Sequence, residues 1–391
     1  MALEKKDPKL FWKGVKELIR PYKNDNTNIS PNMWSTHFSG LLNSSCKKRD
    51  EQFHEYVSES LPTLESIAPS NGPLDFNITP EEIERSINTL KNNRSHGPDL
   101  ISNIMLKRSC KQLLNPLTSL FNLILKNQKY PKQWDLSYIT PIHKKGDLND
   151  ANNYRGIAIS SCLSKVFTSI LNYRLTNYMS ENNLWRRNQC GFMKGHRTED
   201  NLFILQTLFQ KYAVNKHQKL YIAFVDFSKY FDTIDRDSLY YKMLKLGLHG
   251  HFYHLIKSMY SGTKFSVKIM NGSLPYFISR MGVKQGCNLS PTLANLFQND
   301  LHDIFDKECN PVTLGNITFN SLSWADDLVL LATSSGGLQR CLEKLQTYCY
   351  KWGLTVNERK TKWMTFSNGS RQSAIEIEYD NNIIEQVRTF T

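Results

Sequence analysis

The chain has 391 residues, of which 40% are hydrophobic and 22% charged, a composition typical of globular proteins with one large or two modest domains. Its 49 Lys and Arg residues against 36 Asp and Glu residues give a formal net charge of +13, which favours a polyanionic partner, either nucleic acid or an anionic membrane surface. The sequence contains neither an apolar run that could span a bilayer nor a signal peptide, so we expect an intracellular protein, in the nucleus or the cytoplasm.

The first part of the chain predicts an extension that leads into the main domain. Residues 1–75 are polar and rich in Asn and Ser, and they favour short helices and loops around four aromatic residues: Phe11, Trp12, Trp34 and Phe38. "NITPEEIERSINTL" predicts a helix, in which Thr79 caps the start, Pro80 takes the first helical position and Glu82 completes a capping box. Residues 92–99, "NNRSHGPD", predict a loop.

The middle of the chain predicts a helix, a basic hairpin and a buried strand. The pattern is helical over residues 113–128, and "YPKQWDLSYITPIHKKGDLNDANNYRGIAI" then contains two strand-like pieces. "LYIAFVDFS" is apolar enough for a buried strand. "LHGHFYHLI" puts His251 and His254 on one helical face, but ordinary packing histidines are favoured over a zinc site because no Cys or carboxylate completes the ligand set. The 8 Cys residues form no C-x-x-C pair and are interpreted as reduced core thiols.

The last third predicts two amphipathic helices with a hairpin between them. "LSPTLANLFQNDLHDIF" and "LQRCLEKLQTYCYKWG" have helical periodicity, and Gly353 ends the second helix. Residues 321–332, "SLSWADDLVLLA", predict the hairpin. Strands and helices are mixed without a regular β–α alternation, which indicates an α+β fold rather than a doubly wound sheet.

Three aspartates occupy places where a carboxylate is costly. Asp326 and Asp327 lie between two apolar strands, and Asp226 ends another. The pair could be ordinary turn residues, or oxygen ligands for Mg²⁺. If the strand of Asp226 pairs with the hairpin, three carboxylates converge, and two metal ions ~3.5–4 Å apart could clamp an in-line phosphoryl displacement. Together with the basic charge, this favours phosphodiester chemistry on nucleic acid.

Seven motifs then follow in the order of one known family. "HGPDLI", "PIHKKGDLNDANNYRGIAI", "QCGFMKGHRTED", "FVDFSKYFD", "GVKQGCNLSP", "WADD" and "WGLTVNERKTKWMTF" resemble those of the reverse transcriptase domain of non-LTR (LINE-type) retrotransposons, over roughly residues 75 to 391. Four positions depart from the usual residues of that family: Leu100, Gly156, Tyr230 and Trp324.

The resemblance implies a right-hand polymerase fold with fingers and a palm whose mainly antiparallel sheet is backed by helices. Residues 1–75 would form the N-terminal extension, 76–220 the fingers and 221–391 the palm. Within the palm, motif A would cover about 221–236, motif B 282–291, motif C 321–332 and the motif D/E region 338–391. We expect the helical thumb, an endonuclease and a zinc knuckle to be missing, so that the chain is a C-terminally truncated fragment, a degenerate copy or an incomplete gene model with a weak grip on primer and template.

The resemblance also implies the residues of the reaction centre. Asp226, Asp326 and Asp327 would bind two Mg²⁺ ions, with Mn²⁺ as an alternative. The backbone at Phe227 would support the triphosphate, and Phe231 falls at the aromatic steric gate that selects dNTP over rNTP. A core phenylalanine is the plainer interpretation of Phe231.

The remaining implied residues contact the incoming nucleotide. Arg155 and either Lys144 or Lys145 would neutralise the triphosphate, although a solvated basic loop gives the same pattern. Gln285 and Gly286 would lie beside the nucleotide. Lys360 would be the general acid for the pyrophosphate leaving group, with Lys362 as the alternative and surface lysines as the plainer interpretation of both.

The sequence therefore predicts an RNA-directed DNA polymerase that uses an RNA template, a DNA primer and dNTP, with no membrane partner. Two other functions stay open. One is a catalytically inactive remnant that still binds nucleic acid, which the four departures favour. The other is a maturase-type splicing cofactor, to which "NYRGI" and "KTKWMTF" are less similar. The template RNA and the oligomeric state are left open.

Overall fold

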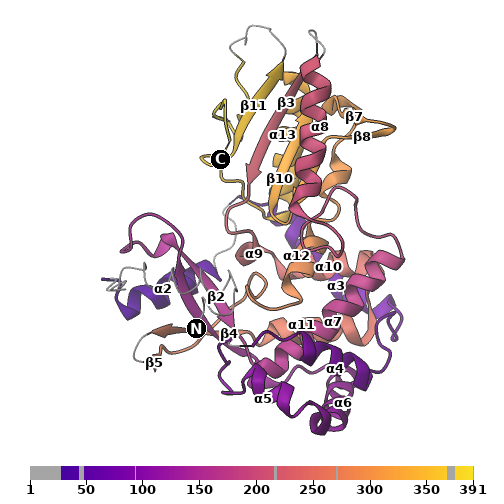
Figure 1. The fold of residues 1–391 in the computed structure, drawn as a ribbon, viewed down its shortest axis with the longest axis vertical. Helices are drawn as coiled ribbons and strands as arrows, with labels where there is room; N and C mark the ends of the chain where they lie inside the picture. Colours follow the sequence, from indigo (N-terminus) through magenta and orange to yellow (C-terminus); the bar gives the residue numbers. More distant parts are fainter. Residues whose placement is uncertain are drawn as a thin grey trace, which may run out of the picture.

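The computed structural model describes residues 28–43, 48–92, 94–214, 218–269, 272–367 and 375–390. The predicted aromatic positions Phe11 and Trp12 lie outside these ranges. Helices and mainly antiparallel sheets are mixed along the chain, which confirms the predicted α+β class. Figure 1 shows a four-stranded sheet at one end of the long axis and the helices α4, α5 and α6 at the other. Among the described helices, none has the length and apolar character that crossing a membrane requires.

The first half of the described chain is mostly helical. Its helices are α2 (Pro31–Leu41), α3 (Glu51–Ile67), α4 (Pro80–Thr89), α5 (Asn103–Arg108), α6 (Cys110–Asn127), α7 (Cys162–Glu181) and α8 (Thr198–Val214). The predicted capping box is present at the start of α4. The Thr79 hydroxyl accepts a hydrogen bond from the Glu82 N–H, and the Glu82 carboxylate accepts one from the Thr79 N–H at 3.0 Å. Two orphan N–H groups of the first turn are thereby satisfied.

The predicted basic hairpin belongs to a five-stranded sheet. It consists of β1 (Leu136–His143) and β2 (Tyr154–Ile159), and β1 also pairs in parallel with β4 (Lys264–Ile269). The short strands β5 (Gly272–Ser273) and β6 (Phe277–Ile278) complete it. Helix α2 packs on this sheet through Trp34 and Phe38, which share a buried cluster with Ile139 and Phe265. Trp34 and Phe38 are therefore core residues of the hairpin layer.

The second sheet has the order β11-β3-β10-β9, and its neighbours are all antiparallel. Its strands are β3 (Lys219–Asp226), β9 (Ser321–Trp324), β10 (Asp327–Ala332) and β11 (Lys362–Ser367). Residues along β3 alternate between two buried clusters, so Tyr221 and Ala223 face the layer of α13 (Ser335–Trp352), whereas Leu220 and Ile222 face α8. Because both faces are covered, the strand is apolar throughout rather than alternating.

The remaining elements link the two sheets. They are α9 (Tyr230–Thr233), α10 (Arg236–Lys245), α11 (Gly250–Ser261), α12 (Ser290–Phe297), the hairpins β7 (Val312–Leu314)–β8 (Ile317–Phe319) and β12 (Glu378–Tyr379)–β13 (Asn382–Ile383), and the 3-10 turns Lys132–Trp134, Ala151–Asn153, Leu301–Ile304 and Lys307–Cys309. The predicted helix from residue 289 to 305 is therefore two elements. Helix α12 ends at Phe297, and the Lys242 ammonium group donates to this last carbonyl at 2.5 Å.

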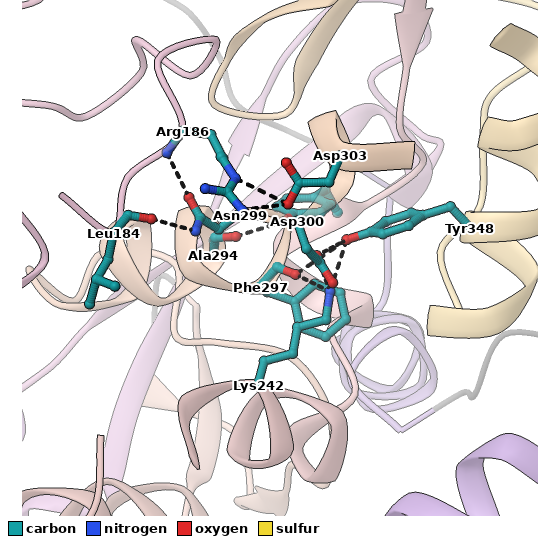
Figure 2. Close-up of polar contacts among 10 residues, drawn as sticks. Leu184, Arg186, Lys242, Ala294, Phe297, Asn299, Asp300, Asp303 and Tyr348 are labelled. Atoms are coloured by element: carbon teal, nitrogen blue, oxygen red, sulfur yellow. Dashed lines mark hydrogen bonds and ion pairs between the residues drawn. The ribbon is translucent and has the colours of Figure 1, made fainter. Parts of the chain in front are cut away.

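Lys242 joins three elements in the interior, as Figure 2 shows. Its ammonium group also contacts Asp300 at 2.6 Å and the Tyr348 hydroxyl at 2.8 Å, and that hydroxyl donates to Asp300 at 2.7 Å. The Trp352 ring lies 3.8 Å from the Lys242 nitrogen. Helices α10, α12 and α13 are thus held together by one buried cation whose three protons all have acceptors.

Candidate active site

Strand pairing brings the three predicted aspartates to one end of the four-stranded sheet. Asp226 is the last residue of β3 and Asp327 the first of β10, and the antiparallel register places them directly opposite each other. Asp326 precedes Asp327 in the turn of the β9–β10 hairpin. The predicted hairpin is confirmed, and so is its pairing with the strand of Asp226.

The turn that carries Asp326 is tight. Trp324 pairs with Asp327, so only Ala325 and Asp326 form the connection. Ala325 has a φ of 57°, in the left-handed region that residues with a Cβ rarely adopt. Such a residue persists only where its surroundings hold it in place. The hairpin tip is therefore held by neighbouring groups rather than by its own preference.

Burial is the main electrostatic cost at this tip. Burial raises the pKa of Asp326, and Asp226 raises it further, while Arg155 opposes the rise. The pKa of Asp327 is also raised, first by desolvation and then by Asp326 and Asp226. Both pKa values are raised, and desolvation contributes more than mutual repulsion, because apolar strands surround the tip.

A cleft of about 520 Å³ opens beside the aspartates. Its lining includes these predicted residues: Lys144, Arg155, Asp226, Phe227, Phe231, Gln285, Gly286, Asp326 and Lys360. They come from the β1–β2 hairpin, the end of β3, α9, the loop before α12, the β9–β10 turn and the segment before β11. Segments far apart in the sequence thus meet around one cavity. Lys145 and Asp327 are not among its lining residues.

The structure separates the paired alternatives for the basic residues. Lys144 lines the cleft and Lys145 does not. The pKa of Lys144 is lowered by burial and then by the charge of Arg155. The Lys360 ammonium group lies 3.3 Å and 3.5 Å from the two carboxylate oxygens of Asp226, whereas Lys362 donates to Glu385 at 2.7 Å. Lys360 is therefore the lysine that reaches the aspartates.

Aromatic residues form another part of the wall. Phe227 lines the cleft although it is buried. The Phe231 ring is partly exposed and meets the Phe192 ring edge-on, with 6.3 Å between centroids and 84° between planes. Phe231 is thus a residue of the cleft wall and not of the sealed core.

Gln285 and Gly286 are fixed from two sides. The Gln285 carbonyl accepts a hydrogen bond from the Ala158 N–H at 2.8 Å, and its side-chain amide donates to both oxygens of Asp232 at 2.8 Å. Gly286 has a φ of 109°, and a Cβ there would lie 2.5 Å from the Ala158 oxygen. Only glycine allows this approach to β2.

Sequence reasoning missed Asp232. It lines the cleft, and burial of the carboxyl group raises its pKa to about 6 even though Gln285 donates to it. The signal was present in "FVDFSKYFD", where a second aspartate follows Asp226 by six positions. Nothing local to that motif indicated the glutamine that pairs with it.

The donor set suits Mg²⁺. In the described part of the chain, no three Asp, Glu, His or Cys side chains are close enough to enclose a metal ion by themselves. Mg²⁺ does not require such a cage, because it takes one or two carboxylates and completes its octahedron with water and substrate phosphate. Asp226, Asp326 and Asp327 could supply oxygen ligands, and a cation would offset the cost of burial that raises the pKa values of Asp326 and Asp327.

The sequence of this site matches that of a known protein family. A family model described as reverse transcriptase (RNA-dependent DNA polymerase) matches residues 142–385, which hold all the cleft residues named above. The chain belongs to the reverse transcriptase family. Its resemblance to non-LTR retrotransposon reverse transcriptases is confirmed by the relatives that follow.

Several insect proteins are similar to this reverse transcriptase chain. It is 32% identical over 322 residues to the probable RNA-directed DNA polymerase from transposon BS of Drosophila melanogaster, covering 78% of this chain and 34% of the relative. It is 28% identical over 322 residues to the RNA-directed DNA polymerase from mobile element jockey of Drosophila funebris, covering 81% and 34%. It is 29% identical over 284 residues to the Pol polyprotein from the type-2 retrotransposable element R2DM of Drosophila melanogaster, covering 72% and 26%. The chain spans about a third or less of these relatives.

Two of the four departures of this reverse transcriptase chain are compensated by packing. A Cβ on Gly156 would lie 2.6 Å from the Phe38 ring, so the glycine leaves room for helix α2. Tyr230 is buried, and its hydroxyl donates to the Ala294 carbonyl of α12 at 2.8 Å. Trp324 is the last residue of β9 and pairs with Asp327 across the hairpin.

Proposed function

We propose that the chain is an RNA-directed DNA polymerase that transfers a nucleotide from dNTP to the 3′-hydroxyl of a DNA primer on an RNA template. In this proposal, residues 76–220 are the fingers and 221–391 the palm. The observation that carries the proposal is the register of β3 and β10, which puts Asp226 opposite Asp327 beside a cleft lined by Asp326 and cationic groups.

The proposal assigns Asp226, Asp326 and Asp327 to two Mg²⁺ ions, or Mn²⁺ in their place. When bound, such ions stabilise the attacking and the leaving oxygen of an in-line displacement. The chain itself keeps the three carboxylates ready at a sheet end where backbone pairing fixes two of them. The raised pKa values of Asp326 and Asp327 make proton release part of metal binding at this tip, so metal affinity should increase with pH.

Lys144, Arg155 and Lys360 form the cationic side of the proposed nucleotide site. Arg155 offers a planar fork and Lys144 a point charge, and both suit the triphosphate oxygens. The Lys360 ammonium group forms an ion pair with Asp226. With Asp226 engaged as a metal ligand, that ammonium group would be free to turn toward the leaving phosphate and to act as its proton donor.

The opposite wall would select and orient the sugar and base. In this proposal the Phe231 ring, which lines the cleft, would exclude a 2′-hydroxyl. Gly286 would let the backbone approach the nucleotide, and Gln285, whose side-chain nitrogen donates to Asp232, would offer its side-chain oxygen as the acceptor.

Primer extension tests the proposal. The chain is given a DNA primer annealed to RNA, dNTPs and Mg²⁺, beside Asp326→Asn and a matched Asp237→Asn control at an exposed position of α10. We expect extension by the wild type and the control, and loss of at least about 10³-fold in Asp326→Asn, because a charge ligand for the transition state is removed. Retained RNA binding without extension in the wild type would contradict the proposal and identify a binding remnant instead.

A further inference from the structure

The segment Asn188–Gly191 lies along β9 as an added edge. The Ser323 N–H donates to the Asn188 carbonyl at 2.8 Å, and the Cys190 N–H donates to the Ser323 carbonyl at 3.0 Å. Gln189 and Ser323 form a parallel bridge. This segment begins the "QCGF" motif, residues 189–192, to which the proposed function assigns no metal-binding or nucleotide-binding role.

Gln189 holds the peptide groups of Ala325 on both sides. Its side-chain oxygen accepts the Ala325 N–H at 3.0 Å, and its side-chain nitrogen donates to the Ala325 carbonyl at 3.1 Å. Gln298 donates to the same carbonyl. Both glutamines are buried, with 3% and 2% of their surface exposed. The one strained residue of the hairpin is thus held by a two-point amide contact that water cannot easily replace.

Gly191 allows this contact to form. A Cβ at Gly191 would lie 2.1 Å from the Ala325 nitrogen, so any side chain would push the segment away from the turn. The Gly191 N–H donates to the Gln189 side-chain oxygen at 2.7 Å, and Asn295 of α12 donates to the Gly191 carbonyl at 2.6 Å. The orientation of the Gln189 side-chain amide is therefore fixed by three backbone groups: the Ala325 and Gly191 N–H groups donate to its oxygen, and the Ala325 carbonyl accepts from its nitrogen.

We propose that Gln189 is a positioning residue, which holds Ala325 in its left-handed conformation and so aims the carboxylate of Asp326 into the cleft. The inference rests on the proposed polymerase function. Asp326 follows Ala325 directly, so a change of backbone angle at Ala325 swings the Asp326 side chain away from Asp226. The residue touches neither the cleft nor the proposed ligands and acts only through the turn.

Mn²⁺ binding measures this positioning without requiring turnover. Mn²⁺ is titrated into the chain and followed by electron paramagnetic resonance, with Asp326→Asn as the reference for loss of the site. We expect Gln189→Ala to weaken Mn²⁺ affinity about 10- to 100-fold, the usual effect of removing a group that orients a metal ligand. Primer extension should fall by a similar factor.

Asn320→Ala is the matched control. Asn320 is also buried, and its side chain also binds two backbone carbonyls, those of Cys309 and Leu331, at 3.0 Å each, but at the far end of the hairpin. It should lower thermal stability about as much as Gln189→Ala and leave Mn²⁺ affinity unchanged. Equal losses of affinity in the two variants, or wild-type affinity in Gln189→Ala, would overturn the proposal.

A second substitution tests whether Gln189 acts through the backbone conformation of Ala325, and it separates that effect from a folding defect. Glycine adopts a positive φ freely, so Ala325→Gly in the Gln189→Ala background should restore part of the Mn²⁺ affinity. No restoration in a folded double variant would contradict a role through Ala325.

A wild type that binds Mn²⁺ at Asp326 but does not extend primers would refute the proposed polymerase function and leave the positioning role intact. A wild type that extends primers while Gln189→Ala behaves identically would refute the positioning role alone.

Discussion

Leu100 adopts a left-handed backbone conformation, with a φ of 58°, in the loop where the resembling family usually has glycine. Its side chain is 66% exposed, so no packing repays the strain. A residue with a Cβ in this region costs roughly 1–2 kcal/mol more than glycine, against a glycine entropy cost of about 0.5–1 kcal/mol. This departure, unlike Gly156 and Tyr230, carries a physical penalty.

We therefore expect Leu100→Gly to raise the free energy of unfolding by about 0.5–1 kcal/mol, measured by urea denaturation. Leu100→Ala is the control, because alanine keeps the Cβ and should change stability little. A gain in the alanine variant equal to that in the glycine variant would show that the exposed side chain, not the backbone angle, was the cause.

Asp232 gives a pH dependence with a defined sign. Burial raises the pKa of its carboxyl group to about 6, above the usual 3.8, so the folded state holds a proton that the unfolded state has released. Between about pH 4 and pH 6 the folded state binds more protons, so the contribution of Asp232 to stability falls as pH rises. Part of the side chain remains open to the cleft, so the expected size is on the order of 1–2 kcal/mol.

Asp232→Asn should remove this component. The difference in unfolding free energy between wild type and variant, measured from pH 4 to pH 7, should shift in favour of the variant as pH rises. Asp237→Asn, at an exposed site on the next helix, serves as the control and should give a flat difference. A flat difference for Asp232→Asn as well would mean that its carboxyl group titrates normally in the folded chain.

At the scale of elements, one buried lysine decides how three helices meet. Lys242 lies in α10 and reaches the end of α12, the Asp300 turn and Tyr348 of α13 (Figure 2). Burial lowers the pKa of Lys242 to about 8, and Asp300 opposes the shift. The lysine is therefore charged at neutral pH and depends on these partners for its place in the interior.

Lys242→Met should destabilise the chain by about 2–3 kcal/mol, because the Phe297 carbonyl, Asp300 and the Tyr348 hydroxyl all lose the buried ammonium group that donates to them, while Asp300 keeps access to water. Urea denaturation measures it, with Lys245→Met at an exposed position of the same helix as the control. A neutral Lys242→Met would show that apolar packing against Trp352, not the ion pair, joins the helices.

Helix α2 shows a similar dependence between elements. Its Phe38 fills the space beside Gly156 of β2, so the extension and the hairpin fit each other. Gly156 is therefore better explained by this close packing against Phe38 than by loss of function in a degenerate copy. This pairing bears on the cleft, because Gly156 and Arg155 both line it.

At the scale of the molecule, the net charge of +13 predicts binding that depends on salt. Each phosphate contact with a single strand contributes about −0.7 to the slope of log K against log salt. Arg155 is assigned to the dNTP triphosphate and not to the RNA backbone, so Arg155→Ala should leave this slope unchanged, as should Lys245→Ala on a helix away from the cleft. Fluorescence anisotropy of labelled RNA at several salt concentrations measures the slope. A slope that is shallower by about 0.7 in Arg155→Ala would instead show that Arg155 contacts an RNA phosphate.

Much of the secondary structure and the list of cleft residues could be predicted from local sequence. The capping box at Thr79, the apolar strand before Asp226 and the paired aspartates each carry their signal within a few residues. The helix predicted across residues 289–305 was too long, and the donor to the carbonyl at its true end, Lys242, is far away in sequence. Asp232 was missed for the same reason, since its partner Gln285 is 53 positions away.

The sequence by itself was enough to identify the family, the α+β class and the three candidate carboxylates. Periodicity and short motifs depend on residues that are close together in the chain. Only the tertiary structure shows that Lys144 rather than Lys145 lines the cleft, and that Lys360 contacts Asp226 whereas Lys362 contacts Glu385, since neighbours on one strand or loop point in different directions. It also disclosed the contact of Gln189 with Ala325, which spans 136 positions. Contacts of that range depend on how sheets and helices pack, and no local pattern of residues records that packing.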